Sequence, residues 1–306
     1  MRVLLFGDGR WAANSLVALC EAGHVITAVV LRVHPSDPEL EQAARERGIP
    51  LLQPAKVNAP EFISELGSVS PDVGLSIAYN QIFRRSAYDF LPFGLINFHA
   101  GKLPLYRGRN VVNWAILNGE TEIGLTAHLV DDGIDTGDIV LQKTFPIHWM
   151  DGYGDVLERI VSEFPACVLE TIGRIESGQV ERTPQPEGEG TYFPGRGPDD
   201  EWLDWNDSSF NLHNKVRAIT RPGPGAKTML DGVEVRIWRA YYDSKWTNYI
   251  ATPDVVVGRT ELGVRVKTRD SVLQIEEIQM PGCNPTKPTW RMGTRLGVDH
   301  REFRMP

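Results

Sequence analysis

The chain has 306 residues and a net charge of −8, and 42% of its residues are hydrophobic against 24% charged. This balance is typical of globular proteins with one large or two ordinary domains. No run of about 18 apolar residues is present, so we expect no membrane span. The first residues resemble a buried strand more than a signal peptide, and Cys20, Cys167 and Cys283 are isolated. Both features predict a cytoplasmic protein with reduced thiols.

The charge is distributed unevenly along the chain. Residues 1–200 hold 16 Lys and Arg against 27 Asp and Glu, a balance of −11, whereas residues 201–306 hold 16 against 13, or +3. Broad nucleic-acid binding depends on neutralising phosphates with basic surface. The acidic body therefore argues against a nucleic-acid partner.

Strand and helix patterns alternate through the first 180 residues. The expected strands are 3–6, 25–31, 49–52, 73–78, 96–99, 125–130 and 139–145, and the expected helices are 11–22, 38–47, 59–69, 111–118 and 154–175. This alternation predicts an α/β fold with a doubly wound, mainly parallel, Rossmann-like sheet. We assign it to a first domain of residues 1–190.

The pattern changes between about residues 185 and 205, where prolines and glycines interrupt it. A helix over 210–219 is followed by short alternating runs at 233–238, 254–259, 264–268 and 272–278. Short strands split by turn residues predict a small, OB-like β-barrel. We assign it to a second domain, residues 200–306.

Polar residues follow two of the central strands. Asn97 and His99 end one strand, and Asp135 lies in a glycine-framed loop 36 residues after His99. Strand ends of open α/β sheets are where catalytic side chains gather. An Asn can donate to an oxyanion, a His can carry a proton, and an Asp can orient that His. The set suits acyl transfer from a carbonyl donor to an amine, with no metal. His128 is a possible third member of the set, although for it we favour a structural role, or one that supports the catalytic side chains.

A second motif, Gly7-Asp8-Gly9-Arg10-Trp11-Ala12, fits the dinucleotide fingerprint G-x-G-x-x-A. The next strand, however, ends at Arg32 and not at the acid that would bind a ribose, and Asp8 would repel a pyrophosphate. We therefore expect a strand-to-helix turn that lines a substrate pocket, and no nicotinamide site. No Cys or His spacing indicates zinc.

With Leu103-Pro-Leu-Tyr-Arg-Gly108 between them, Asn97, His99 and Asp135 reproduce a known signature. Over about residues 1–180 the chain resembles the formyltransferases that use N10-formyltetrahydrofolate. Residues 200–205 and 214–226 resemble the start of the C-terminal barrel of the longer members, such as methionyl-tRNA formyltransferase.

Among the branches of this family, the sugar N-formyltransferases are the most similar in amino-acid sequence around residues 79–83 and 106–114. This resemblance implies a nucleotide-linked amino sugar as acceptor, for example a dTDP- or UDP-4-amino sugar, and a role in lipopolysaccharide O-antigen biosynthesis. Methionyl-tRNA formyltransferases carry a long basic insertion after the second strand, whereas residues 32–39 here are short and acidic-leaning. Methionyl-tRNA remains the alternative acceptor. A formyltetrahydrofolate hydrolase and a nicotinamide-dependent oxidoreductase are less favoured alternatives.

The resemblance also implies a distribution of roles. The catalytic residues are Asn97, His99 and Asp135. The folate would contact Ala78, Asn80, Ile82, Phe83, Val130, Asp131 and Asp132. The acceptor would contact Gly9, Arg10, Lys102, Tyr106, Arg107 and Arg109, although a structural turn role for Arg107 is equally favoured. The implied partners are small molecules, with no nucleic acid and no membrane, and the sequence leaves a homodimer open.

In the expected mechanism the amine attacks the formyl carbonyl to give a tetrahedral oxyanion. The Asn97 amide and a protonated His99 would donate to that oxygen. Asp135 would keep His99 protonated and help move a proton from the amine to N10 of the folate.

Overall fold

A computed structural model describes residues 1–33, 38–186 and 188–297. The chain forms two compact units. The N-terminal unit comprises Met1–Val111, Glu122–Pro146 and Glu158–Pro194, and the C-terminal unit comprises Val112–Thr121, Ile147–Leu157 and the residues from Gly195 onward. Among the described residues, no helix combines the length and the apolar character needed to cross a membrane.

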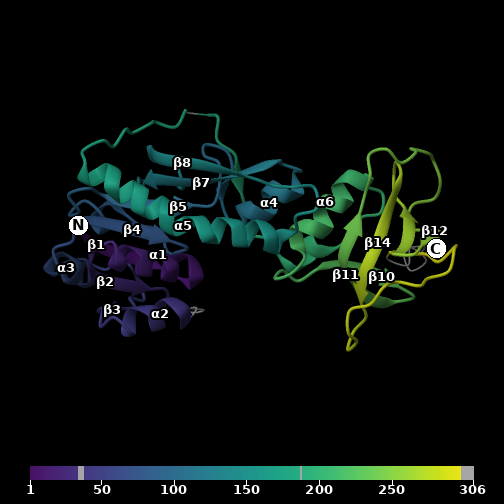
Figure 1. The fold of residues 1–306 in the computed structure, drawn as a ribbon, viewed down its shortest axis with the longest axis horizontal. Coiled ribbons are helices and arrows are strands. Elements are labelled where there is room, and N and C mark those ends of the chain that lie inside the picture. Colours follow the sequence, from purple (N-terminus) through teal and green to yellow (C-terminus); the bar gives the residue numbers. More distant parts are fainter. Residues whose placement is uncertain (34–37, 187, 298–306) are drawn as a thin grey trace, which may run out of the picture. The chain divides into compact units, whose positions relative to one another are not determined.

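A seven-stranded sheet forms the centre of the N-terminal unit, in the order β3-β2-β1-β4-β5-β7-β8 (Figure 1). The first five strands are parallel, and β7 and β8 run antiparallel. The elements are β1 (Arg2–Gly7), α1 (Gly9–Glu21), β2 (Val25–Leu31), α2 (Pro38–Arg45), β3 (Leu51–Leu52), α3 (Pro60–Ser68), β4 (Val73–Ile77), β5 (Leu95–His99), α4 (Val111–Leu117), β7 (Glu122–Leu129), β8 (Ile139–Pro146) and α5 (Tyr153–Glu176). The predicted α/β class with a mainly parallel sheet is confirmed.

The side chains of β1 point alternately to the two faces of the sheet, and those on both faces are buried. Leu4 and Phe6 point to the side where Phe62 and Leu66 of α3 complete one apolar cluster. Val3 and Leu5, on the opposite side, are also fully buried. The strand order reverses between β1 and β4, so the crossovers that follow leave the sheet in opposite directions. Such a switch point opens a crevice at the carboxyl ends of the strands, where ligands bind in open α/β sheets.

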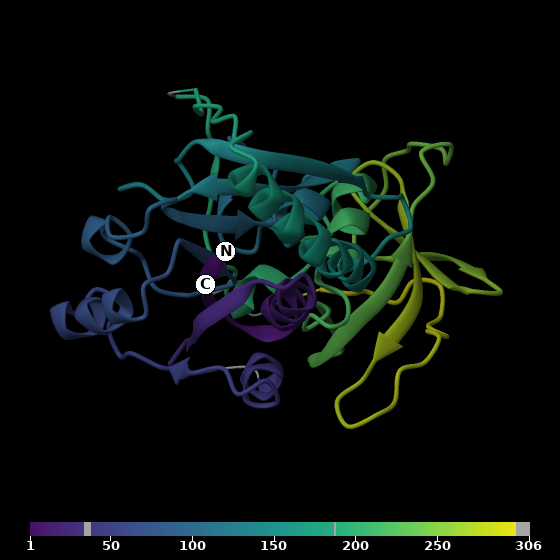
Figure 2. The ribbon, with the colours of Figure 1, turned by 60° about the vertical axis from the view of Figure 1, so that its left-hand side comes forward.

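The C-terminal unit contains α6 (Ser209–Ile219) and a five-stranded antiparallel sheet in the order β10-β11-β14-β13-β12 (Figure 2). Its strands are β10 (Ala226–Leu230), β11 (Val233–Tyr241), β12 (Val256–Thr260), β13 (Gly263–Lys267) and β14 (Val272–Gln279). Residues 294–297 connect the two edge strands, because Val256 N donates to Thr294 O (2.8 Å) and Gly297 N donates to Met229 O (2.9 Å). These residues thereby bridge the two edges of the sheet. The sequence prediction missed β10, which directly follows a run of prolines and glycines.

Candidate active site

The end of β5 and the loop after β7 bring the three predicted catalytic residues together. Asn97 and His99 are two residues apart on β5 and point the same way. The Asn97 Nδ2 atom lies 3.4 Å from one carboxylate oxygen of Asp135, and His99 Nδ1 lies 3.7 Å from the other. The antiparallel pairing of β5 with β7 sets the end of β7 beside Ile96, and the loop that follows folds back so that Asp135 reaches Asn97 and His99.

His128, which the sequence indicated as a possible further member, belongs to the same cluster. It lies directly opposite Asn97 in the β5–β7 register, is almost fully buried, and places Nε2 3.1 Å from Asn97 Nδ2 and 3.5 Å from Asp135. Its Nδ1 lies 2.9 Å from the carbonyl oxygen of Leu129, which can only accept. Nδ1 therefore carries the proton, and Nε2 accepts from the Asn97 amide. The other hydrogen of that amide faces Asp135 in a long contact of 3.4 Å, which is the one that a developing oxyanion could take over.

The buried imidazole of His99 is oriented by a backbone carbonyl. Its Nε2 donates to Tyr106 O at 2.6 Å, so Nδ1 is the nitrogen that faces Asp135. Burial lowers the pKa of His99, and the Asp135 carboxylate and the Tyr106 carbonyl oppose this effect without overcoming it. The expectation of a protonated His99 is therefore not favoured by its surroundings. A neutral ring with Nδ1 open is a proton acceptor.

Asp135 is held in its ionised form. Its backbone has a left-handed φ of 54°, and its carboxylate accepts a hydrogen bond from Gly108 N at 2.8 Å. Burial alone would raise the pKa of Asp135. The neighbouring imidazoles of His99 and His128 and the hydrogen bond from Gly108 N outweigh burial and lower the pKa to about 2. A carboxylate in this position stabilises positive charge on either neighbouring imidazole.

The residues predicted to contact an acceptor lie in different surroundings. Arg10 is exposed and forms a bidentate ion pair with Glu158 at 2.6 and 2.9 Å, and Lys102 pairs with Glu122. Tyr106 and Arg107 are buried, Arg109 is exposed, and Gly9 begins α1 with a left-handed φ of 66°. Most of the predicted phosphate contacts are thus already occupied by carboxylates or enclosed by the chain.

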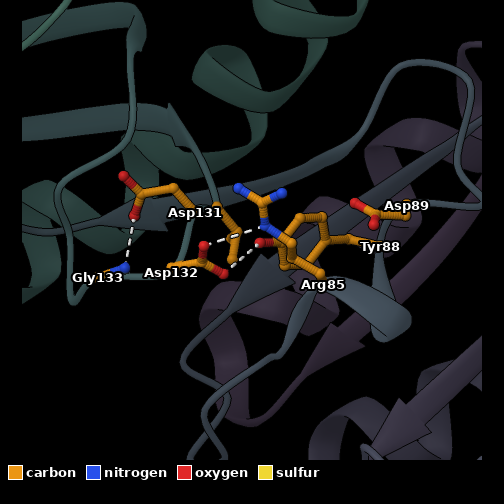
Figure 3. Close-up of a pocket in the computed structure, with 7 residues that line it drawn as sticks. Arg85, Tyr88, Asp89, Asp131, Asp132 and Gly133 are labelled. Carbon is orange, nitrogen blue, oxygen red and sulfur yellow. Dashed lines mark hydrogen bonds and ion pairs between the residues drawn. The ribbon is translucent and has the colours of Figure 1, made fainter.

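Three of the predicted folate residues line a cavity of about 480 Å³ (Figure 3). Its lining consists of Arg85, Tyr88, Asp89, Val130, Asp131, Asp132 and Gly133. Asp132 accepts from Arg85 Nε at 3.0 Å and from the Tyr88 hydroxyl at 3.4 Å, so the two segments of the cavity wall are joined.

The other predicted folate residues are not among the described residues that line this cavity. Ala78, Asn80 and Ile82 are exposed in the loop after β4. Phe83 instead packs in the core, with its ring 4.9 Å from that of Phe6 and 5.5 Å from that of Tyr79. A direct contact between Phe83 and a ligand would require this packing to open.

The glycine turn after β1 contains its own ion pair. Asp8, which is 4% exposed, pairs with Arg32 at the end of β2. These are the two residues that the sequence analysis held against a dinucleotide site, and the fold brings them together. Gly7 is needed there because a Cβ would lie 2.6 Å from the Cβ of Ala12. Within residues 1–33, 38–186 and 188–297, no group of His, Cys, Asp and Glu is arranged to hold a metal ion.

Comparisons with known proteins agree with this architecture. Residues 1–172 match the formyl transferase family model, and residues 197–293 match the model of the formyl transferase C-terminal domain. The methionyl-tRNA formyltransferase of Desulforamulus reducens is 33% identical over 299 residues, covering 94% of this chain and 93% of that protein. The methionyl-tRNA formyltransferase of Geobacter sulfurreducens is 30% identical, with coverage of 98% and 99%.

A structural neighbour from Helicobacter canadensis, an N-formyltransferase in complex with folinic acid and dTDP-3-aminofucose, superimposes with a TM-score of 0.69. It is 21% identical and is covered over its whole length by 91% of this chain. At that identity the likeness shows the fold alone. The family models cover most of the chain, and the chain therefore belongs to the formyl transferase family and is a formyltransferase.

Proposed function

We propose that the chain transfers the formyl group of N10-formyltetrahydrofolate to a primary amine. The observation that carries the proposal is the cluster of Asn97, His99 and Asp135 at the end of β5, with contacts of 3.4 and 3.7 Å. Structural neighbours solved with 5-N-formyl-THF or folinic acid support a folate donor. The cavity lined by Val130, Asp131 and Asp132 is the candidate seat for part of that donor.

The proposed reaction needs no covalent intermediate. The neutral amine attacks the formyl carbon, and the carbonyl electrons form an oxyanion that accepts from the Asn97 amide. Removing a donor of this kind costs about 3 kcal/mol of transition-state stabilisation. His99 Nδ1 takes the proton from the attacking nitrogen, and Asp135 stabilises the resulting imidazolium. The proton then passes to N10 as the bond between N10 and the formyl carbon breaks, which gives the formamide and tetrahydrofolate.

For the acceptor, methionyl-tRNA is the better supported candidate. Methionyl-tRNA formyltransferases are the relatives that match at 30–33% identity over more than nine tenths of this chain, through both domains. This support extends to the C-terminal unit, to which the sequence analysis could assign no role.

A nucleotide-linked amino sugar is the second candidate, and the charge distribution favours it. Residues 1–200 carry a balance of −11, and the connection over residues 32–39 is short, although residues 34–37 lie outside the described part of the chain. The amine would still need a site for its diphosphate. Arg10 and Lys102 could supply it by exchanging their carboxylate partners for phosphate oxygens.

Mass spectrometry of parallel reactions tests these proposals. Purified protein is incubated with N10-formyltetrahydrofolate and either methionyl-tRNA or a dTDP- or UDP-linked amino sugar. We expect a product in which one formyl group replaces a hydrogen, with methionyl-tRNA as the preferred acceptor. A formylated sugar alone would select the second candidate. Folate turnover that is equal with and without acceptor would contradict both and indicate a hydrolase.

A further inference from the structure

The chain that follows α5 passes over the catalytic loops. We call its residues 183–186 and 190–193 the strap (Figure 1). Thr183 exchanges backbone hydrogen bonds of 2.8 and 2.9 Å with Ile139 at the start of β8. Further along, β9 (Tyr192–Phe193) pairs in parallel with β6 (Arg107–Gly108). The strap is therefore fixed at both ends within the N-terminal unit.

The segment under the strap, residues 106–108, contacts both proposed catalytic side chains. Tyr106 O accepts from His99 Nε2 at 2.6 Å, and Gly108 N donates to the Asp135 carboxylate at 2.8 Å. The strap holds this segment in turn, because Thr191 Oγ1 accepts from Tyr106 N at 2.9 Å. The relative position of His99 and Asp135 thus depends on residues 106–108 and on what fixes them.

Gln185, in the strap, forms hydrogen bonds both to the loop that carries Asp135 and to Arg107. Its Nε2 donates to the carbonyl oxygens of Asp135 (2.9 Å) and Gly137 (2.8 Å). Its Oε1 accepts from Arg107, at 2.6 Å from Nη2 and 3.2 Å from Nε. One amide side chain therefore joins the loop that carries Asp135 to the segment that orients His99. It also explains why Arg107 is buried and turned toward the strap.

The backbone at these positions needs such support. Tyr106 and Asp135 have left-handed φ values of 60° and 54°, a conformation that non-glycine residues adopt only at an energetic cost. Without hydrogen bonds to hold them, both turns would relax toward more favourable conformations. Asp135 would then move away from Gly108 N and from His99.

We propose that Gln185 is a positioning residue for formyl transfer, which acts by holding the Asp135 loop against the segment that orients His99. This inference rests on the proposed roles of His99 and Asp135. It goes beyond those roles, because it makes catalysis depend also on Gln185, which contacts neither the donor nor the acceptor in this scheme.

Two substitutions isolate the contacts. Gln185→Glu keeps an acceptor for Arg107 but removes both donors to the Asp135 loop, and Gln185→Ala removes all of them. The matched control is Gln279→Glu in the C-terminal unit, where the amide also accepts from a side chain, Trp238 Nε1, and donates to a carbonyl, Cys283 O, both at 2.9 Å. The control should resemble the unsubstituted protein in every readout.

The first readout is the pKa of His99, followed by NMR of the histidine side chains without ligand and assigned with His99→Gln. The groups that face His99 are Asp135, the Tyr106 carbonyl and His128. Because Asp135 attracts the proton, we expect its displacement in Gln185→Ala to lower the pKa of His99. Gln185→Glu brings a carboxylate of its own and is therefore compared by kinetics alone. A role in stability alone would lower the unfolding temperature and leave this titration unchanged.

The second readout is kinetics with N10-formyltetrahydrofolate and methionyl-tRNA, or the dTDP-linked amino sugar if that is the acceptor used. Small misplacements of catalytic groups cost about 10-fold to 100-fold. We expect kcat to fall about 10-fold or more in both variants, with each KM changing less than about 3-fold. An unchanged kcat and titration in folded Gln185→Ala, or an unchanged kcat in folded Gln185→Glu, would overturn the inference, as would a rise in KM alone or failure of both variants to fold. If His99→Ala keeps normal turnover, the proposed mechanism fails; if it is inactive while Gln185 variants are normal, only this inference fails.

Discussion

The two ring nitrogens of His99 face different partners, and this difference decides which proton transfer the residue can perform. Nε2 is committed to the carbonyl of Tyr106, and Nδ1 faces Asp135. A ring in this tautomer accepts a proton at Nδ1 and finds a carboxylate 3.7 Å away to stabilise the charge. In the proposed mechanism, the proton of the attacking amine would pass to His99 Nδ1.

The pH dependence of the reaction follows from this assignment. Burial lowers the pKa of His99 below the ordinary value of 6.5, so the neutral base is present at neutral pH and is lost only as the pH falls through that lowered pKa. We expect kcat/KM to rise with pH on the acid side and to stay level through neutrality. The measurement is a pH–rate profile at constant ionic strength. A rate that declines as the pH rises from about 6 to about 8 would instead mean that protonated His99 is required.

Alanine substitutions test the cluster itself. Asn97→Ala, His99→Ala and Asp135→Ala should each reduce kcat about 100-fold or more, because each removes an oxyanion donor, the proton carrier or the group that stabilises its charge. Their effects should not add, since the three residues act as one unit. Steady-state kinetics of the single and double variants measures this. Additive losses, or near-normal turnover of His99→Ala, would contradict the mechanism.

The sequence could predict the contacts of this cluster that follow from local strand geometry, but not those that depend on tertiary structure. Asn97 and His99 share a face because side chains on a strand alternate with a period of two. The contact between Asn97 and His128 depends on the register of β5 against β7, which local pattern does not specify. Gln185 lies 50 residues beyond Asp135 in a segment without periodicity, so no local signal could have indicated its role.

At the scale of the elements, long apolar runs were predictable and very short strands were not. The predicted strand over 25–31 has the same bounds as β2, and the predicted helix over 154–175 differs from α5 by one residue at each end. β6 and β9 have two residues each and arise from tertiary pairing, which no pattern of a few residues can show. Yet this small pair lies beside the catalytic loops.

The β6–β9 pair can be tested at Gly108. Its φ is 100°, and a Cβ there would lie 2.3 Å from Phe193 O. Gly108→Ala should separate the two strands and reduce kcat about 10-fold or more, since Gly108 N also donates to Asp135. The control is Gly232→Ala, where φ is 79° and nothing lies within 4 Å of the added Cβ, so that conformational strain is the whole cost. Equal activity losses in the two variants would show that strain alone explains the effect.

At the scale of the whole molecule, the domains predicted from the sequence differ from the compact units of the structure. The sequence prediction places one boundary between residues 190 and 200, whereas the compact units take up separate stretches of chain. Val112–Thr121 and Ile147–Leu157 group with the C-terminal unit although they precede the predicted boundary. Contacts far apart in sequence define such units, and a scan along the chain does not contain them.

Net charge gives a prediction at the same scale. A protein of charge −8 that binds tRNA must do so through local cations that displace counterions from phosphates. With methionyl-tRNA as acceptor, KM should rise about 10-fold or more between about 50 and about 200 mM salt. The KM for the folate donor should change less than about 3-fold, because it brings far fewer charges. Initial rates at each salt concentration measure both, and equal sensitivity would contradict a phosphate-dominated acceptor site.

The pairing of Asp8 with Arg32 has a consequence for how this fold is used. In dinucleotide-binding relatives of the architecture, the first turn and helix N-terminus are a seat for a phosphate group that arrives with the ligand. Here the chain supplies an anion of its own at the end of β1, together with its counterion. A phosphate arriving at this turn would meet the Asp8 carboxylate, so we expect no dinucleotide to bind there. The proposed reaction lies instead at the end of β5.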